Sequence, residues 1–314
     1  MSRDGPAIAR LLESSMSASP RSPGVALLVS LRPAQWSKNL ILFAGLIFGG
    51  KLLDPSSARA AGLAFLVFCA LSGVVYLVND VRDVEADRQH PTKARRPIAA
   101  GELSPANALA AAALIAAGAL AVAWWLGWQF LIVSTAYVGL LTLYSTVLKH
   151  HAIIDVLTIA AGFVLRAVAG TVVVEVAVSH WLLVLTLLGA LFLALGKRRA
   201  ELVTLVDGGA AHRRSLADYS PQLLDQLITI VAGATLLAYA FYTISPETVA
   251  KFGTDRLLWT LPFPLYGIFR YLYLIHQRAG GANPSETLFQ DRPILASVVL
   301  AALVSVVLIY GPWR

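Results

Sequence analysis

The residues with the clearest chemical meaning in this 314-residue sequence form an acidic stretch between positions 79 and 88. On a single helix, Asn79, Asp83 and Asp87 would lie along one stripe, about 6 Å apart in height, because each step is four residues. Asp80 lies beside that stripe. Carboxylates this close repel one another, and a hard divalent cation relieves the repulsion by taking their oxygen atoms as ligands. We therefore predict that Asn79, Asp80, Asp83 and Asp87 bind Mg²⁺ and that the three aspartates are catalytic.

Basic residues follow the acidic stretch directly. Lys93, Arg95 and Arg96 lie between two prolines and bring positive charge close to the predicted metal ligands. Magnesium in proteins typically keeps one or two carboxylates and takes its remaining ligands from water and substrate phosphates. Acid and base together thus favour a metal–diphosphate site. The simpler alternatives are a solvated helix end with local ion pairs to Arg82 and Arg88, and basic residues that serve only membrane orientation.

The composition places these residues in a membrane protein. Hydrophobic residues make up 57% of the chain and charged residues 14%, against about 25% charged in soluble domains, and the mean hydropathy is +0.69. A soluble enzyme, a disordered scaffold and a secreted disulfide-rich module are excluded, the last because Cys69 is the single cysteine. We attribute the net charge of +7 to loops on the cytoplasmic side of a lipid bilayer, so we expect no nucleic-acid partner.

The apolar runs predict an all-α, polytopic protein. Residues 1–30 are expected to be a disordered cytoplasmic tail without a signal peptide, followed by one transmembrane domain over residues 31–314. Nine runs approach the roughly 17–25 residues that a span needs; eight is the alternative count, because the first run is short. The predicted helices are Ser37–Leu53, Ala58–Val81, Pro105–Leu126, Trp128–Val147, Ile153–Val176, Ser179–Leu202, Pro221–Ile244, Leu257–His276 and Arg292–Tyr310. The second is expected to continue through the acidic stretch.

Charge asymmetry predicts the orientation. With a cytoplasmic N-terminus, 18 of the 25 lysines and arginines fall in segments on the inner side of the predicted spans, and only 5 fall outside. Inner loops of membrane proteins carry such an excess of positive charge. We therefore expect a multi-pass protein of the inner (plasma) membrane, with its N-terminus and its active site on the cytoplasmic side.

The acidic motif resembles that of a known family. Asn79-Asp80-x-x-Asp83-x-x-x-Asp87, followed by Lys93-x-Arg95-Arg96-Pro97-Ile98-x-x-Gly101, is similar to the first motif of the UbiA superfamily of intramembrane prenyltransferases. Tyr144-Ser145 with Lys149 resembles a second recurrent element. The resemblance implies nine transmembrane helices bundled around a central cavity, with Mg²⁺ holding a diphosphate at the acidic stretch.

One departure narrows the resemblance. Members of the superfamily typically carry a second aspartate-rich motif after the sixth helix, where this chain has Lys197, Arg198 and Arg199. Together with Arg32-Pro33-x-Gln35-Trp36-x-Lys38-Asn39, this pattern looks like the decaprenyl-phosphate phosphoribosyltransferase branch of mycobacteria and corynebacteria. That resemblance implies transfer of 5-phosphoribose from 5-phosphoribosyl 1-diphosphate (PRPP) to decaprenyl phosphate, a step toward the arabinan of the cell wall. The donor brings the diphosphate and the acceptor an anionic phosphate, which basic residues would suit.

The remaining candidates follow from this reading. Arg166 lies within a predicted span, where a charged residue indicates either a function or a buried partner. Asp155 could be that partner only across helices, since the two are about 16 Å apart along one helix. The predicted substrate-binding residues are Lys38, Asn79, Lys93, Arg95, Arg96, Tyr144, Lys149, Arg166, Lys197, Arg198 and Arg199.

Two other functions and one assembly remain open on the sequence. A prenyltransferase joining an isoprenyl diphosphate to an aromatic acceptor would be expected to carry the second acidic motif, which is missing here. A lipid-phosphate transporter would more typically show internal repeats and broken helices at mid-membrane, and no inverted repeat is evident. The alanine-rich run at residues 106–113 permits close helix packing within the chain or between protomers, so a homo-oligomer is one expectation.

Overall fold

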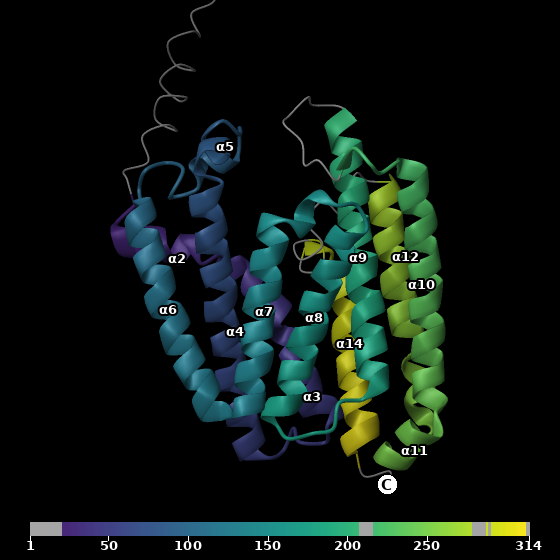
Figure 1. Ribbon diagram of the computed structural model, residues 1–314. Helices are drawn as coiled ribbons and strands as arrows, with labels where there is room; N and C mark the ends of the chain where they lie inside the picture. The colour runs from purple at the N-terminus through teal and green to yellow at the C-terminus, as the bar shows by residue number, and fades with distance from the viewer. Residues whose placement is uncertain (1–20, 207–215, 278–286, 288–289, 312–314) are drawn as a thin grey trace, which may run out of the picture.

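The computed structural model describes residues 21–206, 216–277, 287 and 290–311 and is all-helical over them (Figure 1). Seven of these helices are long and apolar enough to cross a membrane. They are α4 (Pro55–Arg82), α6 (Pro105–Leu126), α7 (Trp128–Thr146), α8 (Ile154–Val173), α9 (His180–Val206), α10 (Pro221–Ile244) and α14 (Arg292–Tyr310). The predicted all-α membrane architecture is thus confirmed, whereas the count of nine spans is not.

Local capping explains why three helices match their predicted bounds. Ser104, Ser220 and Asp291 each accept a hydrogen bond from a backbone N–H in the first turn, and a proline opens or nearly opens each helix. Such caps satisfy amide groups that have no partner inside the helix. The predictions Pro105–Leu126, Pro221–Ile244 and Arg292–Tyr310 agree with α6, α10 and α14.

The first predicted helix is wrong as a continuous α-helix. The chain instead forms a 3₁₀-helix, η1 (Pro33–Leu42), and then a short α3 (Phe43–Phe48). This segment packs tightly on α8, since a Cβ on Gly170 would lie 2.0 Å from the backbone oxygen of Leu42. Gly50, with φ +74°, ends the helical path before Leu53. Close backbone packing thus replaces the regular helix that hydropathy predicted.

Two other boundaries also differ. The predicted Leu257–His276 divides into η5 (Arg256–Thr260) and α12 (Pro262–Gln277), where Pro262 lacks the N–H that would continue an earlier helix. Residues 1–20 of the expected tail lie outside the described residues, but Pro23–Ser30 forms helix α2, in which Ala26 and Ser30 are buried. The expected disorder therefore does not extend to this helix.

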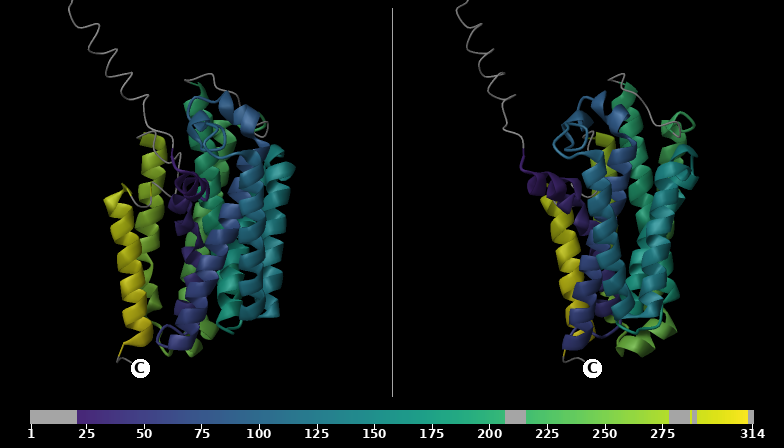
Figure 2. Two further views of the ribbon diagram at one scale, coloured as in Figure 1. Left: turned by 90° about the vertical axis from the view of Figure 1, so that its left-hand side faces the viewer. Right: turned by 60° about the vertical axis from the view of Figure 1, so that its left-hand side comes forward.

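The helices form a bundle in which neighbours in sequence pack side by side. Contacts join α4 to α6, α6 to α7, α7 to α8, α8 to α9 and α9 to α10, while η1 and α3 pack on α4 and α8 (Figures 1 and 2). The short α5 (Val84–Arg88) and η2 (Lys93–Arg95) lie at the end of the bundle opposite α11 (Pro246–Phe252). The acidic stretch therefore lies at one end of the bundle, as the sequence predicted.

A cavity of about 300 Å³ lies among the helices. Its walls come from α3, α8, α9, α10 and α11, and they are mostly apolar. The cavity extends toward α11, at the end of the bundle away from the acidic stretch.

Candidate active site

The acidic stretch does not form one continuous helix. Helix α4 ends at Arg82, and α5 begins at Val84. Between them Asp83 adopts φ −91° and ψ 10°, and its side chain accepts a hydrogen bond from Asn79 Nδ2 at 3.1 Å. Aspartate side chains compete with the helical backbone through such local bonds. The predicted continuation of the helix is therefore wrong at Asp83, and the carboxylates form ion pairs in two groups.

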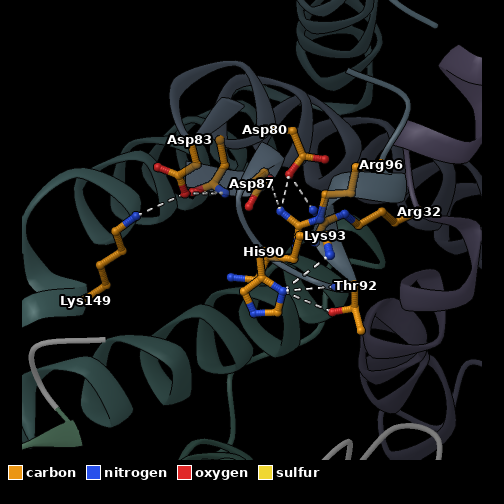
Figure 3. A network of polar contacts seen from close by, with 10 residues as sticks. Arg32, Asp80, Asp83, Asp87, His90, Thr92, Lys93, Arg96 and Lys149 are labelled. Atoms are coloured by element: carbon orange, nitrogen blue, oxygen red, sulfur yellow. Dashed lines mark hydrogen bonds and ion pairs between the residues drawn. The ribbon is translucent and has the colours of Figure 1, made fainter. Parts of the chain in front are cut away.

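The first group pairs Asp80 with Asp87 through Arg96. Arg96 Nη1 lies 3.1 Å from Asp80 Oδ1 and 2.5 Å from Asp87 Oδ2, and both carboxylates are 3% exposed (Figure 3). Arg32 Nη2 adds a second ion pair to Asp80 Oδ1 at 2.5 Å and stacks over the ring of Tyr76. Two buried carboxylates and two guanidinium groups thus meet at the junction of α4, α5 and the loop after η2.

The second group joins Asp83 to η3, which follows α7. Lys149, in η3 (Leu148–His150), places its Nζ 3.3 Å from Asp83 Oδ2, the atom that also accepts from Asn79 (Figure 3). The first group spans the α4–α5 break, and the second contains Asp83, the residue at the break itself. Lys149, which the sequence assigned only through the resemblance, therefore contacts the acidic motif directly.

These residues suit Mg²⁺ only when a substrate supplies further ligands to the metal. No group of three or more His, Cys, Asp or Glu side chains in the described ranges is close enough to hold a metal ion by itself. Asp80 with Asp87, and Asp83 with Asn79, instead provide pairs of oxygen ligands. Magnesium is typically held by one or two carboxylates together with substrate phosphates. The arrangement suits a metal that arrives with a phosphorylated substrate, and the guanidinium and ammonium groups now on the carboxylates could pair with that substrate.

The other basic candidates of this end differ in their surroundings. Lys93 and Arg95 are exposed on η2, and Figure 3 shows Lys93 beside His90, whose Nδ1 accepts from the Lys93 backbone N–H. Their side chains are free to meet a solvated anion. Arg96, in contrast, is partly buried and engaged with both aspartates.

The three cations on α9 are already paired with carboxylates. Arg198 is 1% exposed, with Nε 2.7 Å from Asp155 Oδ2 and Nη1 2.5 Å from Glu201 Oε2. Lys197 Nζ lies 3.7 Å from Glu201, and Arg199 pairs with Asp225 and donates to the Ile275 carbonyl. The prediction that Arg198 binds an anionic substrate stays a prediction, and it would require Arg198 to exchange Asp155 and Glu201 for phosphate oxygens.

Tyr144 and Tyr219 complete this α9 network. Arg198 Nη2 donates to the Tyr144 hydroxyl at 3.3 Å, so Tyr144 lies against the α8–α9 ion pair. The Tyr219 hydroxyl donates to Asp155 Oδ1 at 2.9 Å and accepts from the Ile153 backbone N–H at 2.6 Å. Burial raises the pKa of Tyr219 to about 12, so its proton stays available for Asp155.

Arg166 has partners other than Asp155. Its Nε donates to Asn39 Oδ1 at 2.7 Å and its Nη2 to the Tyr137 hydroxyl at 2.6 Å. Asp155 is used by Arg198 instead. Sequence reasoning missed Arg32, Asn39 and Tyr219 as site or supporting residues, and it considered Asp155 only as a partner of Arg166. Arg32 and Asn39 belong to the Arg32–Asn39 pattern, which was a usable sequence signal. The partners of Asp155 lie 43 and 64 residues away in the sequence, so no local pattern indicates them.

Comparisons with known proteins identify the family of the chain. The UbiA prenyltransferase family model matches residues 39–291. The chain is 36% identical to the decaprenyl-phosphate phosphoribosyltransferase of Mycolicibacterium smegmatis, over 87% of this chain and 89% of that protein. It is 34% identical to the enzyme of the same name from Corynebacterium glutamicum, over 92% and 88%. A UbiA homolog from Archaeoglobus fulgidus, solved with GPP and Mg²⁺, has the same fold, with a TM-score of 0.70, 18% identity and coverage of 91% and 98%.

Proposed function

Because this chain belongs to the UbiA prenyltransferase family, we propose that it is the integral-membrane transferase that moves 5-phosphoribose from PRPP to decaprenyl phosphate. The observation that carries the proposal is that the described residues form one acidic site, at the α4–α5 end of the bundle. Asp80 and Asp87 form one buried pair at the end of the bundle, while the corresponding place on α9 holds basic residues already paired with carboxylates. One diphosphate-bearing donor needs only one such site, and the relatives that match nearly all of the chain carry this activity in their names.

The proposed reaction exchanges one phosphate ester for another at ribose C1. The bond from C1 to the diphosphate oxygen breaks, diphosphate leaves with the electron pair, and an oxygen of the lipid phosphate bonds to C1. The lipid phosphate is already anionic, so no strong general base is required. Mg²⁺ bound with the diphosphate would neutralise the charge that grows on the leaving group.

The chain's own residues would hold and orient the donor. Asp80, Asp83 and Asp87, supported by Asn79, would supply the metal's protein ligands. Arg96 and Lys149 would exchange their present carboxylate partners for phosphate oxygens, as both already lie beside the acids. Lys93 and Arg95 are placed at the same end to receive the donor's charge from solvent.

The membrane arrangement follows the same proposal. The segments 33–48 and 256–277 would add two crossings to the seven long helices, giving nine over the catalytic domain of residues 31–314. The excess of basic residues would place the acidic end and the N-terminus on the cytoplasmic side of the plasma membrane. PRPP is a soluble, highly charged molecule, and such an end would be open to it. The product would serve arabinan synthesis for the cell wall.

The direct test uses purified protein in detergent with Mg²⁺, decaprenyl phosphate and PRPP labelled in the ribose. We expect label in a lipid-extractable product and its complete loss with EDTA, restored by excess Mg²⁺. The variant Asp83→Asn should lower the rate, because it removes a predicted ligand. Transfer instead from an isoprenyl diphosphate to an aromatic acid, with no labelled lipid from PRPP, would contradict the proposal.

A further inference from the structure

A second positively charged site, around Arg166, lies deeper in the bundle than the acidic site. Arg166 on α8 is 5% exposed, and its three hydrogen bonds go to Asn39 Oδ1, the Tyr137 hydroxyl and the Gly162 carbonyl. All three acceptors are neutral. Its guanidinium therefore keeps a full positive charge among buried residues, and within the described ranges no carboxylate forms an ion pair with it.

Lys38 adds a second charge at the same place. It is half-buried on η1 directly before Asn39, whose side-chain oxygen accepts a hydrogen bond from Arg166. In the described structure its ammonium group has no hydrogen bond or ion pair. Like charges held together in a poorly solvated place are unfavourable unless an anion lies between them. The pair Lys38 and Arg166 thus has the chemistry of an anion site.

This place is distinct from the metal site. Asn39, the shared neighbour, contacts Ser72 and Cys69 on α4. These residues precede Asp80 by eight and eleven positions on the same helix, which corresponds to about 12 and 16 Å along its axis. An anion here would lie well below the diphosphate proposed at Asp80 and Asp87.

The apolar cavity begins directly beyond the two cations. In a 3₁₀-helix, side chains three residues apart lie above one another, so Lys38 shares a face with Ile41, about 6 Å further along. Ile41 lines the cavity of about 300 Å³, as do Phe48, Leu182 and Leu236. On the facing helix, Thr171 of the cavity wall follows Arg166 by five residues, about 7.5 Å. The cavity wall therefore begins within about 6 to 8 Å of the two cations, measured along η1 and α8.

We propose that Lys38 and Arg166 bind the phosphate of the polyprenyl phosphate acceptor and that the adjoining cavity receives the first part of its isoprenoid chain. The assignment rests on the proposed function and names the site of its second substrate. The shared chemistry is a phosphate monoester, which the 5-phosphate of the donor also carries. The apolar walls directly beyond the cations favour the lipid, because the ribose end of the donor has no hydrocarbon to bury.

The phosphate contact is tested with Lys38→Gln, measured as KM for each substrate separately. We expect the KM for decaprenyl phosphate to rise about 10- to 100-fold, as loss of a charge-assisted hydrogen bond does, while the KM for PRPP changes less than about twofold. Lys38→Arg should recover most of the affinity. The matched control is Lys51→Gln, which removes the same charge from an exposed position. A rise in the KM for PRPP alone, or no change in either, would overturn the assignment.

The cavity is tested on neighbouring residues of α10. Leu236 lines the cavity, whereas Leu237 is 62% exposed on the outside. Leu236→Trp should weaken the binding of farnesyl phosphate and of longer polyprenyl phosphates alike, because both place their first isoprene units in the cavity, and Leu237→Trp should leave the binding of both unchanged. Equal effects of the two variants would contradict the chamber's role.

A binding measurement separates this inference from the proposed reaction. Farnesyl phosphate, added without PRPP, should raise the thermal midpoint of the wild-type protein in detergent, and farnesol should not. The rise should disappear in Lys38→Gln. If the wild-type protein binds farnesyl phosphate in this way but transfers no phosphoribose, the reaction is wrong and the lipid site stands; transfer without this Lys38-dependent binding would refute the site alone.

Discussion

Replacing Asp80 with asparagine should lower the rate of phosphoribosyl transfer by about 10³-fold or more, since metal-assisted charge stabilisation is worth several kcal/mol and each 1.36 kcal/mol is a factor of ten. Asp80 is the carboxylate on which the site converges. It is 3% exposed, and Arg32 and Arg96 both contact its Oδ1. Asparagine keeps the shape of the side chain and removes its charge, so the loss should come from metal and diphosphate binding rather than from packing.

The matched control is Glu85→Gln in the same acidic stretch. Its carboxylate is 77% exposed and pairs only with Arg88, three residues away, in the described structure. This variant makes the same chemical change one turn from the site, and its rate should stay within about twofold of the wild type, as exposed pairs contribute little. The decisive comparison is the Mg²⁺ dependence: Asp80→Asn should need a higher Mg²⁺ concentration for half-maximal rate. Wild-type Mg²⁺ dependence in Asp80→Asn would remove the residue from the metal site.

The helices were predictable because their signals are local. Hydrophobic runs bounded by a capping serine or aspartate and a proline gave the ends of α6, α10 and α14 correctly. The first segment was not predictable in this way. Its hydropathy is that of a span, but its backbone conformation depends on Gly170, more than a hundred residues later, which lets Leu42 approach. Tertiary packing here overrides the local preference.

The candidate site, like the fold, could be predicted from the sequence only in part. The residue types of the acidic motif indicated a metal and a phosphate, and the structure places Arg96 and Lys149 on those acids as the motif suggested. Helical spacing by itself groups Asp80 with Asp87, which are seven residues or about two turns apart, but it did not show that the helix breaks at Asp83 or that Arg32 pairs with Asp80. The sequence also could not show that Arg198 forms an ion pair with Asp155. A basic run on a helix has the same sequence pattern whether its partners are phosphates or distant carboxylates.

The largest effect on stability is expected from replacing Arg198. Replacing Arg198 with methionine should destabilise the protein by about 3–5 kcal/mol, the usual cost of removing one partner from a buried ion pair. Asp155 would then be left fully buried and charged, with only the Tyr219 hydroxyl and the Val156 backbone N–H as donors. The measurement is unfolding of the protein in detergent, followed by temperature or denaturant.

The double variant Arg198→Met, Asp155→Leu distinguishes a structural from a substrate-binding arginine. Removing both charges takes away the uncompensated carboxylate, and replacing buried pairs by apolar side chains is often neutral or stabilising. If Arg198 acts as the structure indicates, the double variant should regain most of the stability and retain substrate KM values close to those of the wild type. If Arg198 bound a phosphate, stability would return in the double variant while the KM for one substrate stayed high. The Glu201→Gln variant gives the scale for the exposed side of the network, because Glu201 is 32% exposed and its loss leaves Asp155 in place on Arg198.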